Sequence, residues 1–596
     1  MNESNSTGGA FVDRALPVEC LRTPEEFSDE QKQIRGMTQE FVQNEILPAN
    51  ERIEKVEPGL MRKLVEKAGE LGLLGVEIAE EFGGLGLGMT DAAIVAEAVG
   101  PQASYSISQS VQTGIGSLPI VYFGTPAQKQ KYLPELATGA KFACYALTEP
   151  SSGTDALAAK CRAVATADGK AYVLNGTKMW ITNAGFSDVY IVFAKIDGEK
   201  FSCFIIDRET PGFSVAPEER KLGLKGSSTC ALNLKDARVP AENLLGEIGK
   251  GHKIAFNILN VGRFKLGSSA VGAAKYALHC ALGYAQERQQ FGKSIASFGA
   301  IQAKLGQMAV ACFVGESMIF ATAGLIDRAA TAAGVDAEKT EGGLEERRLT
   351  AIEQHAVECS MMKVGATEIL DRVADEAVQI YGGYGYSAEY PVERIYRDSR
   401  INRIFEGTNE INRIIIPTRL IRAALKGELP VLAEALENPW GGMEHPANVN
   451  AAAYTRGRAV AVALEGMRAS IRMVCGLGHR KFGKGFADEQ ELLSGLADLC
   501  IGLYGAEVSV VRAGKAADAI DPHAELMANL AHVAVQDTIV RFHGTLETLL
   551  PALMDGEAAE RAAEKVRSAL AWKPIDTIHM RREIAQTFLA AGRYFL

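Results

Sequence analysis

The periodicity of the apolar residues changes twice along the chain, and these changes constrain the fold more than any other feature. Up to about residue 140, and again from 251 to about 427, apolar residues recur at the three- and four-residue spacings of helices. Residues 141–245 instead hold short apolar runs separated by turn pairs such as Asn175-Gly176 and Pro211-Gly212. This order predicts a mainly α, α+β protein in which an antiparallel β domain lies between two helical halves.

Cap, turn and linker residues divide this pattern into segments. Ser28 and Thr125 precede helical stretches as expected N-caps. Proline, glycine and asparagine gather at 428–455, which is typical of a linker. The expected units are a loose N-terminal arm (1–24), an N-terminal helical domain (25–140), a middle β domain (141–245), a four-helix bundle domain (246–427) with a bend at 331–346, the linker (428–455) and an extra C-terminal helical domain (456–596).

Composition argues against several classes of function. The formal net charge is −10 and no basic patch occurs, so we expect no nucleic-acid partner. The ten cysteines contain no CxxC pair and the nine histidines no HExxH motif, which predicts reduced thiols and no metal site. The absence of a run of about 18 apolar residues argues against a membrane-spanning helix, and the N-terminus lacks the pattern of a signal or transit peptide. We therefore expect a cytoplasmic protein.

One carboxylate, Glu406, stands in a neighbourhood that suits a general base. Ile404 and Phe405 precede it, and Gly407 and Thr408 follow. The apolar side chains can desolvate the carboxylate, and the glycine lets a flat ligand approach the backbone. From this window alone, a helix-capping or ion-pairing role is the more common alternative.

Four further observations link this window to one family. The stretches YALTEPSSGTDA (145–156), MWITNAG (179–185), ERQQFGK (287–293) and QIYGGYGY with RIFEGTNEI (379–386 and 403–411) occur in the order of the acyl-CoA dehydrogenases, which are flavoenzymes. The resemblance covers residues 25–427. The segment NILNVGRF (257–264) and the C-terminal helical domain resemble the very-long-chain branch.

The resemblance implies roles for the residues that match these motifs. Glu406 occupies the position of the catalytic base, and Gly262, where some relatives carry that base, has no carboxylate. Without the resemblance, the β-domain positions would be ordinary core residues and Arg288 a solvated surface arginine. The implied FAD-binding residues are Tyr145, Leu147, Thr148, Thr154, Trp180, Ile181, Thr182, Arg288, Phe291, Gln379, Gly382, Gly383, Gly407, Thr408 and Asn409, and the implied substrate-binding residues are Thr154 and Arg263.

Two halves of the cofactor would be held in different places. Leu147 and Thr148 would meet the pyrimidine edge of the flavin, with Trp180 shielding the ring. Arg288 and Phe291, with the glycine bend at 379–386, would contact the adenosine end of an FAD bound mainly by a partner subunit. The resemblance therefore implies a homodimer.

The implied reaction is dehydrogenation of a fatty acyl-CoA thioester to trans-2-enoyl-CoA in fatty acid β-oxidation, with electrons passing to an electron-transfer flavoprotein. A long acyl chain is expected, and small residues that could line its pocket are Gly100, Ala103, Ser104, Ser106 and Ser108. The alternatives are an acyl-CoA oxidase that uses oxygen and an assembly or scaffold role on the same fold. Weak association with a membrane surface stays open, although no strongly basic amphipathic helix occurs.

Overall fold

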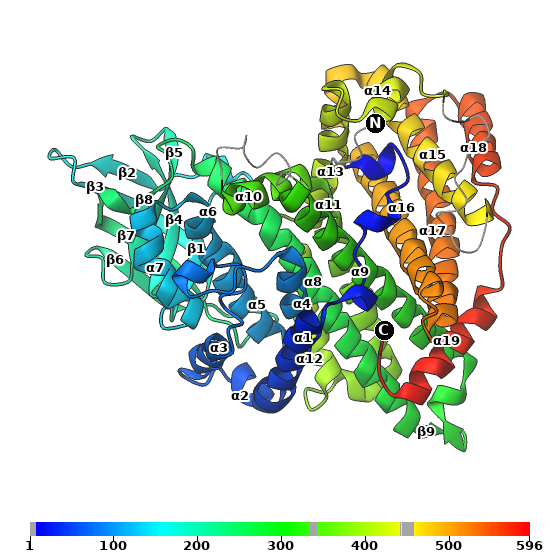
Figure 1. The fold of residues 1–596 in the computed structure, drawn as a ribbon, viewed down its shortest axis with the longest axis horizontal. Coiled ribbons are helices and arrows are strands. Elements are labelled where there is room, and N and C mark those ends of the chain that lie inside the picture. Colours follow the sequence, from blue (N-terminus) through cyan, green and yellow to red (C-terminus); the bar gives the residue numbers. More distant parts are fainter. Residues whose placement is uncertain (1–7, 333–342, 442, 444–457) are drawn as a thin grey trace.

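The computed structural model describes residues 8–332, 343–441, 443 and 458–596, and it confirms the predicted order of helices, β domain and helices (Figure 1). The part of the expected bend at 333–342 and the part of the expected linker at 442 and 444–455 lie outside the described residues.

The N-terminal domain is helical, and its predicted caps are confirmed. The Ser28 hydroxyl accepts a hydrogen bond from the Gln31 N–H, and the Thr125 hydroxyl one from the Gln128 N–H, both at 3.2 Å. π-helical turns follow α1 at Val42–Ile46 and α5 at Gln112–Gly116. The helices are α1 (Asp29–Phe41), α2 (Asn50–Glu54), α3 (Leu60–Glu70), α4 (Met89–Ala98), α5 (Ala103–Val111), α6 (Leu118–Phe123) and α7 (Pro126–Thr138).

The middle domain is one eight-stranded sheet with the order β6-β7-β3-β2-β4-β5-β8, and β1 pairs with β4 off this path. The Asp197-Gly198 turn joins β4 and β5 in a hairpin. The turn expected at Asn175-Gly176 is wrong, because both residues lie inside β3. The expectation of a purely antiparallel sheet is wrong, because β4 pairs in parallel with both β1 and β2. The strands are β1 (Ala143–Ala146), β2 (Arg162–Ala165), β3 (Ala171–Thr182), β4 (Val189–Ile196), β5 (Lys200–Asp207), β6 (Phe213–Glu218), β7 (Thr229–Pro240) and β8 (Leu244–Leu245).

Long helices that pack closely form the next domain. A Cβ atom on Gly267 would lie 3.0 Å from the Met362 carbonyl oxygen, and one on Gly272 only 1.9 Å from that of Glu97, so small residues set these contacts. The helices are α8 (Gly251–Glu287), α9 (Gly299–Ala332), α10 (Leu344–Gln354), α11 (Ala356–Tyr381), α12 (Pro391–Ser399) and α13 (Asn409–Leu425), with a small hairpin of β9 (Gln289–Gln290) and β10 (Lys293–Ser294).

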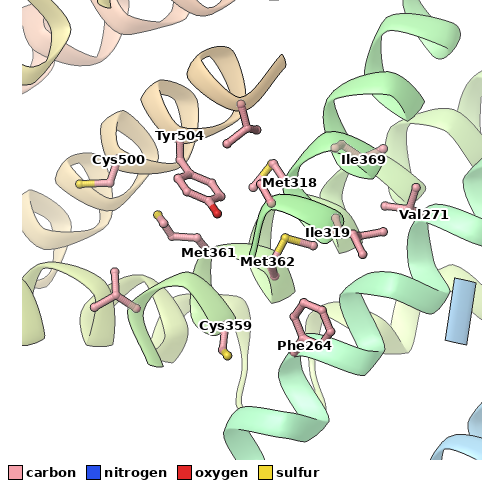
Figure 2. Packing of buried hydrophobic residues seen from close by; sticks show 14 of the residues in the cluster. Phe264, Val271, Met318, Ile319, Cys359, Met361, Met362, Ile369, Cys500 and Tyr504 are labelled. Carbon is pink, nitrogen blue, oxygen red and sulfur yellow. The ribbon is translucent and has the colours of Figure 1, made fainter. Parts of the chain in front are cut away.

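The C-terminal helices share a core with this bundle. Figure 2 shows Cys500 and Tyr504 of α16 among Met318 of α9 and Met361 of α11. The Tyr504 hydroxyl forms a hydrogen bond with the Thr322 hydroxyl at 2.8 Å. The helices here are α14 (Pro430–Glu437), α15 (Arg458–Phe482), α16 (Gln490–Asp518), α17 (Ala524–Leu553), α18 (Gly556–Leu570) and α19 (Thr577–Ala591).

Two helices within the described residues are long and apolar enough to cross a membrane, contrary to the expectation from the sequence. They span Gly299–Thr331 and Gln490–Asp518, and 89% and 72% of their most apolar windows are buried inside the protein. A helix that is packed on all sides in a large core is apolar all round, so it passes the same test.

Residues 8–24 do not form part of a loose arm, as the composition of the N-terminal segment suggests, and residues 1–7 lie outside the described residues. Arg468 Nε donates to the Phe11 carbonyl at 2.8 Å, and Arg472 Nη1 to the Val12 carbonyl at 2.9 Å. The segment therefore lies against α15 (Figure 1). The linker prediction is also wrong in part, because Pro430 begins α14 in its first turn, where a missing N–H is tolerated.

Candidate active site

Glu406 lies in the connection between α12 and α13, on a sharply bent backbone. Glu406 and Gly407 have φ values of 56° and 82°, so two successive residues are left-handed. Such strain persists only where neighbours hold the loop. Arg263 Nε of α8 donates to the Glu406 carbonyl at 3.2 Å, and Lys363 Nζ of α11 donates to the Gly407 carbonyl and the Asn409 side chain, both at 2.7 Å. Two helices, α8 and α11, therefore hold the loop that carries the carboxylate.

The environment of this carboxylate keeps it available for a proton. Glu406 Oε2 is buried and has no hydrogen-bond partner among the described residues. Burial raises the pKa of Glu406 to about 7, although the positive charges of Arg263 and Lys363 oppose the shift. Burial likewise lowers the pKa of Lys363 to about 7, against the attraction of Glu406. A carboxyl group with this pKa can accept a proton near neutral pH.

Two cavities meet at Glu406. The outer chamber has a volume of about 310 Å³, and the inner pocket one of about 50 Å³. Val111, Ile115 and Glu406 line both. The predicted site residues that line the outer chamber are Tyr145, Leu147, Thr148, Thr154, Trp180, Ile181, Thr182, Arg263, Glu406 and Gly407. The structure therefore gathers residues of the β domain, α8 and the Glu406 loop around one space.

The inner pocket runs between α5 and α8, away from the outer chamber. Ala103 and Ser106 line it, as expected, because they lie on one face of α5. Ser104 and Ser108 do not, and the expectation for them is wrong. They are fully buried on another face, where the Ser108 hydroxyl donates to the Ser104 carbonyl at 2.9 Å.

Some predicted cofactor-binding residues lie at a different cavity, which has a volume of about 610 Å³. Arg288, Gly382 and Gly383 line it, and none of its lining residues lines the outer chamber. The Arg288 guanidinium lies over the Tyr384 ring, 5.4 Å from its centroid. Phe291 stands at the tip of the β9–β10 hairpin with φ 52° and is 92% exposed. We call this region the remote cavity.

Three other predicted cofactor-binding residues line neither cavity. Gln379 is exposed near the end of α11. The Thr408 hydroxyl caps α13 by accepting from the Ile411 N–H at 3.3 Å. The Asn409 side chain is buried and is held by Lys363, so it faces the protein and supports the Glu406 loop.

Models of known protein families match four segments of the chain. Descriptions of the acyl-CoA dehydrogenase N-terminal, middle and C-terminal domains match residues 28–140, 144–237 and 249–421. A further acyl-CoA dehydrogenase C-terminal domain matches residues 467–567. The chain belongs to the acyl-CoA dehydrogenase family.

Relatives within this family cover the C-terminal extension as well. A probable acyl-CoA dehydrogenase of Bacillus subtilis (strain 168) is 42% identical over 599 residues, covering 98% of both chains. The mitochondrial very long-chain specific acyl-CoA dehydrogenase of Bos taurus is 34% identical, over 87% of this chain and 79% of its own. A crystal structure of an acyl-CoA dehydrogenase complexed with FAD from Bacillus anthracis has a TM-score of 0.93 at 43% identity, over 99% of this chain and 100% of its own.

Gly262 leaves room for the Glu406 carboxylate. A Cβ atom there would lie 2.7 Å from Glu406 Oε2. We expect Gly262→Ala to displace the carboxylate and to slow flavin reduction by roughly 10- to 100-fold, because a shift of about 1 Å in a reacting group has this effect. Stopped-flow reduction under anaerobic conditions measures the rate.

Gly283→Ala on the same helix is the matched control. A Cβ atom at Gly283 meets nothing within 4 Å, so this variant should reduce its flavin at the wild-type rate. A Gly262→Ala rate equal to that of Gly283→Ala would show that Glu406 does not depend on this space.

Sequence reasoning missed Lys363, although it holds the Glu406 loop. Its side chain is fully buried on α11, 44 residues from Gly407, to whose carbonyl it donates. A lone lysine in an amphipathic helix normally predicts a solvated face, so no local signal marks it. Only the packing of α11 against the loop reveals it.

Proposed function

We propose that this chain is an FAD-dependent acyl-CoA dehydrogenase in which Glu406 removes the α-proton of an acyl-CoA thioester. The observation that carries the proposal is the position of the Glu406 carboxyl. Its Oε2 atom is buried and has no hydrogen-bond partner in the part of the chain that the structure describes. It lies at the junction of the inner pocket and the outer chamber, whose walls hold the flavin-motif residues. A thioester at this junction would place its α-carbon against the base and its acyl chain in the inner pocket.

The outer chamber fits the ring of FAD. Trp180 has φ 58° and is 61% exposed, so a large aromatic face stands open where a flat ring would cover it. Leu147, Thr148 and Thr182 present backbone and hydroxyl groups to the same space. We expect these residues to hold the flavin. When bound, FAD supplies the acceptor for the β-hydrogen, which leaves as hydride.

Side chains of the protein accept the proton and hold the base in position. An α-proton beside a thioester is weakly acidic, so the base must be desolvated and correctly placed. Glu406 Oε2 takes the proton, while Arg263 and Lys363 keep the loop in position through its carbonyl groups. The backbone N–H of Glu406 is the donor that we expect to stabilise the thioester oxygen as negative charge develops.

Flavin bleaching tests the proposal directly. Under anaerobic conditions, a long-chain acyl-CoA should bleach the flavin of the holoenzyme with a kcat/KM that rises with pH through about 7 and then levels off, because kcat/KM follows the pKa of the free enzyme. Below this pH the carboxyl is protonated and cannot accept a proton, so the rate should fall about tenfold per pH unit. No bleaching by any acyl-CoA, at any pH, would refute the activity.

Electron-transfer flavoprotein is the proposed oxidant of the reduced enzyme. The oxidase alternative differs in one measurable way, the speed at which the product-bound enzyme reacts with oxygen. Slow reoxidation by oxygen and fast reoxidation by an electron-transfer flavoprotein support the dehydrogenase. The reverse order would favour an oxidase.

We further propose a long-chain substrate in β-oxidation, a cytoplasmic location and a homodimer. Similarity to a very long-chain specific relative supports the chain length. The remote cavity supports the dimer, because Arg288 lies in a cavity separate from the outer chamber and suits a pyrophosphate bound mainly by a second subunit. Sedimentation of the holoenzyme as a monomer would refute the dimer.

A further inference from the structure

Lys265, in the wall of the inner pocket, belongs to a buried ion pair. Lys265 of α8 and Glu77, in the loop after α3, form a salt bridge, and their side chains are only 4% and 6% exposed. Lys265 Nζ also donates to the Thr113 carbonyl at 2.9 Å. The pair thus joins α8 to the π-helical turn at Gln112–Gly116. Neither residue belongs to the motifs that mark the family.

The pair separates the inner pocket from a second, smaller cavity. That side cavity has a volume of about 10 Å³. Lys265 and Ser110 line both spaces. The rest of the side cavity is mostly apolar, with Leu73, Val76, Ala92, Val95, Ala96 and Val99 in its wall. An acyl chain that passed Lys265 would therefore meet side chains that suit it.

Near Gly100, backbone atoms close the inner pocket. A Cβ atom on Gly100 would lie 2.5 Å from the Ser269 carbonyl oxygen and 2.7 Å from the Ala273 nitrogen. At this end the connection between α4 and α5 lies directly on α8. The Lys265 side of the pocket is different, because side chains rather than backbone form the barrier there.

An ion pair is an unusual barrier in a pocket for an apolar chain. Burying two charges is costly, and an apolar pair of similar volume is often equally or more stable. Apolar side chains can shift to admit another methylene. The charged pair is fixed by a further hydrogen bond to the Thr113 carbonyl, and it cannot move without losing these partners. The barrier is therefore rigid.

We propose that the Lys265–Glu77 ion pair sets the upper limit of acyl chain length in this enzyme. The proposal rests on the acyl-CoA dehydrogenase activity proposed above. In this proposal the ion pair determines specificity at the far end of the acyl chain, away from the reacting carbons. Chains below the limit do not reach the pair and should react at the same rate with or without it.

A pair of double variants tests this limit. Lys265→Ala/Glu77→Ala removes both charges and opens the wall, and changing both partners avoids leaving one buried charge alone. Lys265→Met/Glu77→Leu removes the charges but keeps most of the volume. Each holoenzyme is mixed anaerobically with saturated acyl-CoAs of increasing length, and kcat/KM for flavin reduction is compared with that of the wild type.

The opened variant should accept chains at least two carbons beyond the wild-type limit, with kcat/KM at that length raised roughly tenfold or more. Shorter chains should react within about threefold of the wild type. The Met/Leu variant fills most of the same volume with side chains that can shift, so it should extend the limit, but by less than the opened variant does. An opened variant that retains FAD and shows the wild-type limit would overturn the proposal.

Calorimetric binding of the same acyl-CoAs separates this failure from failure of the activity. A wild type that binds long acyl-CoAs without bleaching its flavin would overturn the proposed reaction. The binding limits of the two double variants would still decide whether the ion pair ends the pocket.

Discussion

Glu406→Gln is expected to retain FAD and to bind acyl-CoA, yet to reduce its flavin roughly 10²–10⁴ times more slowly than the wild type. The amide has nearly the shape of the carboxyl group but cannot take up the α-proton. The loop is held through the carbonyl groups of Glu406 and Gly407, so the substitution leaves those hydrogen bonds in place. Stopped-flow flavin reduction measures the effect, and the flavin absorbance and an acyl-CoA titration verify the two binding steps.

Glu410→Gln is the matched control for this substitution. Glu410 lies four positions further along the same connection, at the start of α13, and is exposed. The same chemical change there should leave the reduction rate unaltered. If Glu406→Gln reduced its flavin within tenfold of the wild type, another group would have to accept the proton, and the assignment of Glu406 would be wrong.

The sequence indicated the base because the residues that suit Glu406 to this role are adjacent to it in the chain. An apolar pair, a carboxylate and a glycine follow one another at residues 404–407, and the empty position at Gly262 could be checked in a second motif. What the sequence does not contain is the contact between them. The steric exclusion of any side chain at Gly262 by Glu406 Oε2 becomes visible only when α8 and the loop are packed together.

Local patterns also predicted the helices, their caps and the hairpins, but they did not predict which distant segments meet. The parallel pairing of β1 with β4 joins strands that are separated by β2 and β3, so no turn residue announces it. The sequence of the N-terminal segment suggests an arm because its partner is distant in the chain. The hydrogen bond between Phe11 and Arg468 of α15 joins residues that are 457 positions apart. Burial of this kind depends on tertiary contacts rather than on composition.

Backbone strain gives an independent indication of function that sequence reasoning could not use. Trp180, Phe291 and Glu406 all have positive φ, although none is glycine. Bulky residues adopt this conformation only where the surrounding structure imposes it, and such positions cluster at functional sites. The three residues come from the β domain, the β9–β10 hairpin and the Glu406 loop.

The second large effect is expected at the junction of the N-terminal segment, α9 and α16. Arg512 is fully buried, and its guanidinium donates to Glu316 at 2.7 Å and to Glu25 at 2.6 Å. Burial alone would raise the pKa of Glu316, but Lys275 and Arg512 lower it to about 2, so it is ionised at neutral pH. Arg512 therefore compensates a negative charge in the core that holds three parts of the chain together.

Arg512→Met should lower the free energy of opening at this junction by about 3–5 kcal/mol, because Glu316 keeps its charge and loses one of its cations. Native-state hydrogen exchange measures the change as lost protection of the amides in α9 and α16. The control is Arg561→Met, whose ion pair with Glu557 is exposed and spans 3.4 Å. That surface pair should contribute less than about 1 kcal/mol. If Arg512→Met kept wild-type protection in α9 and α16, the charged junction would not contribute to joining the C-terminal helices to the catalytic bundle.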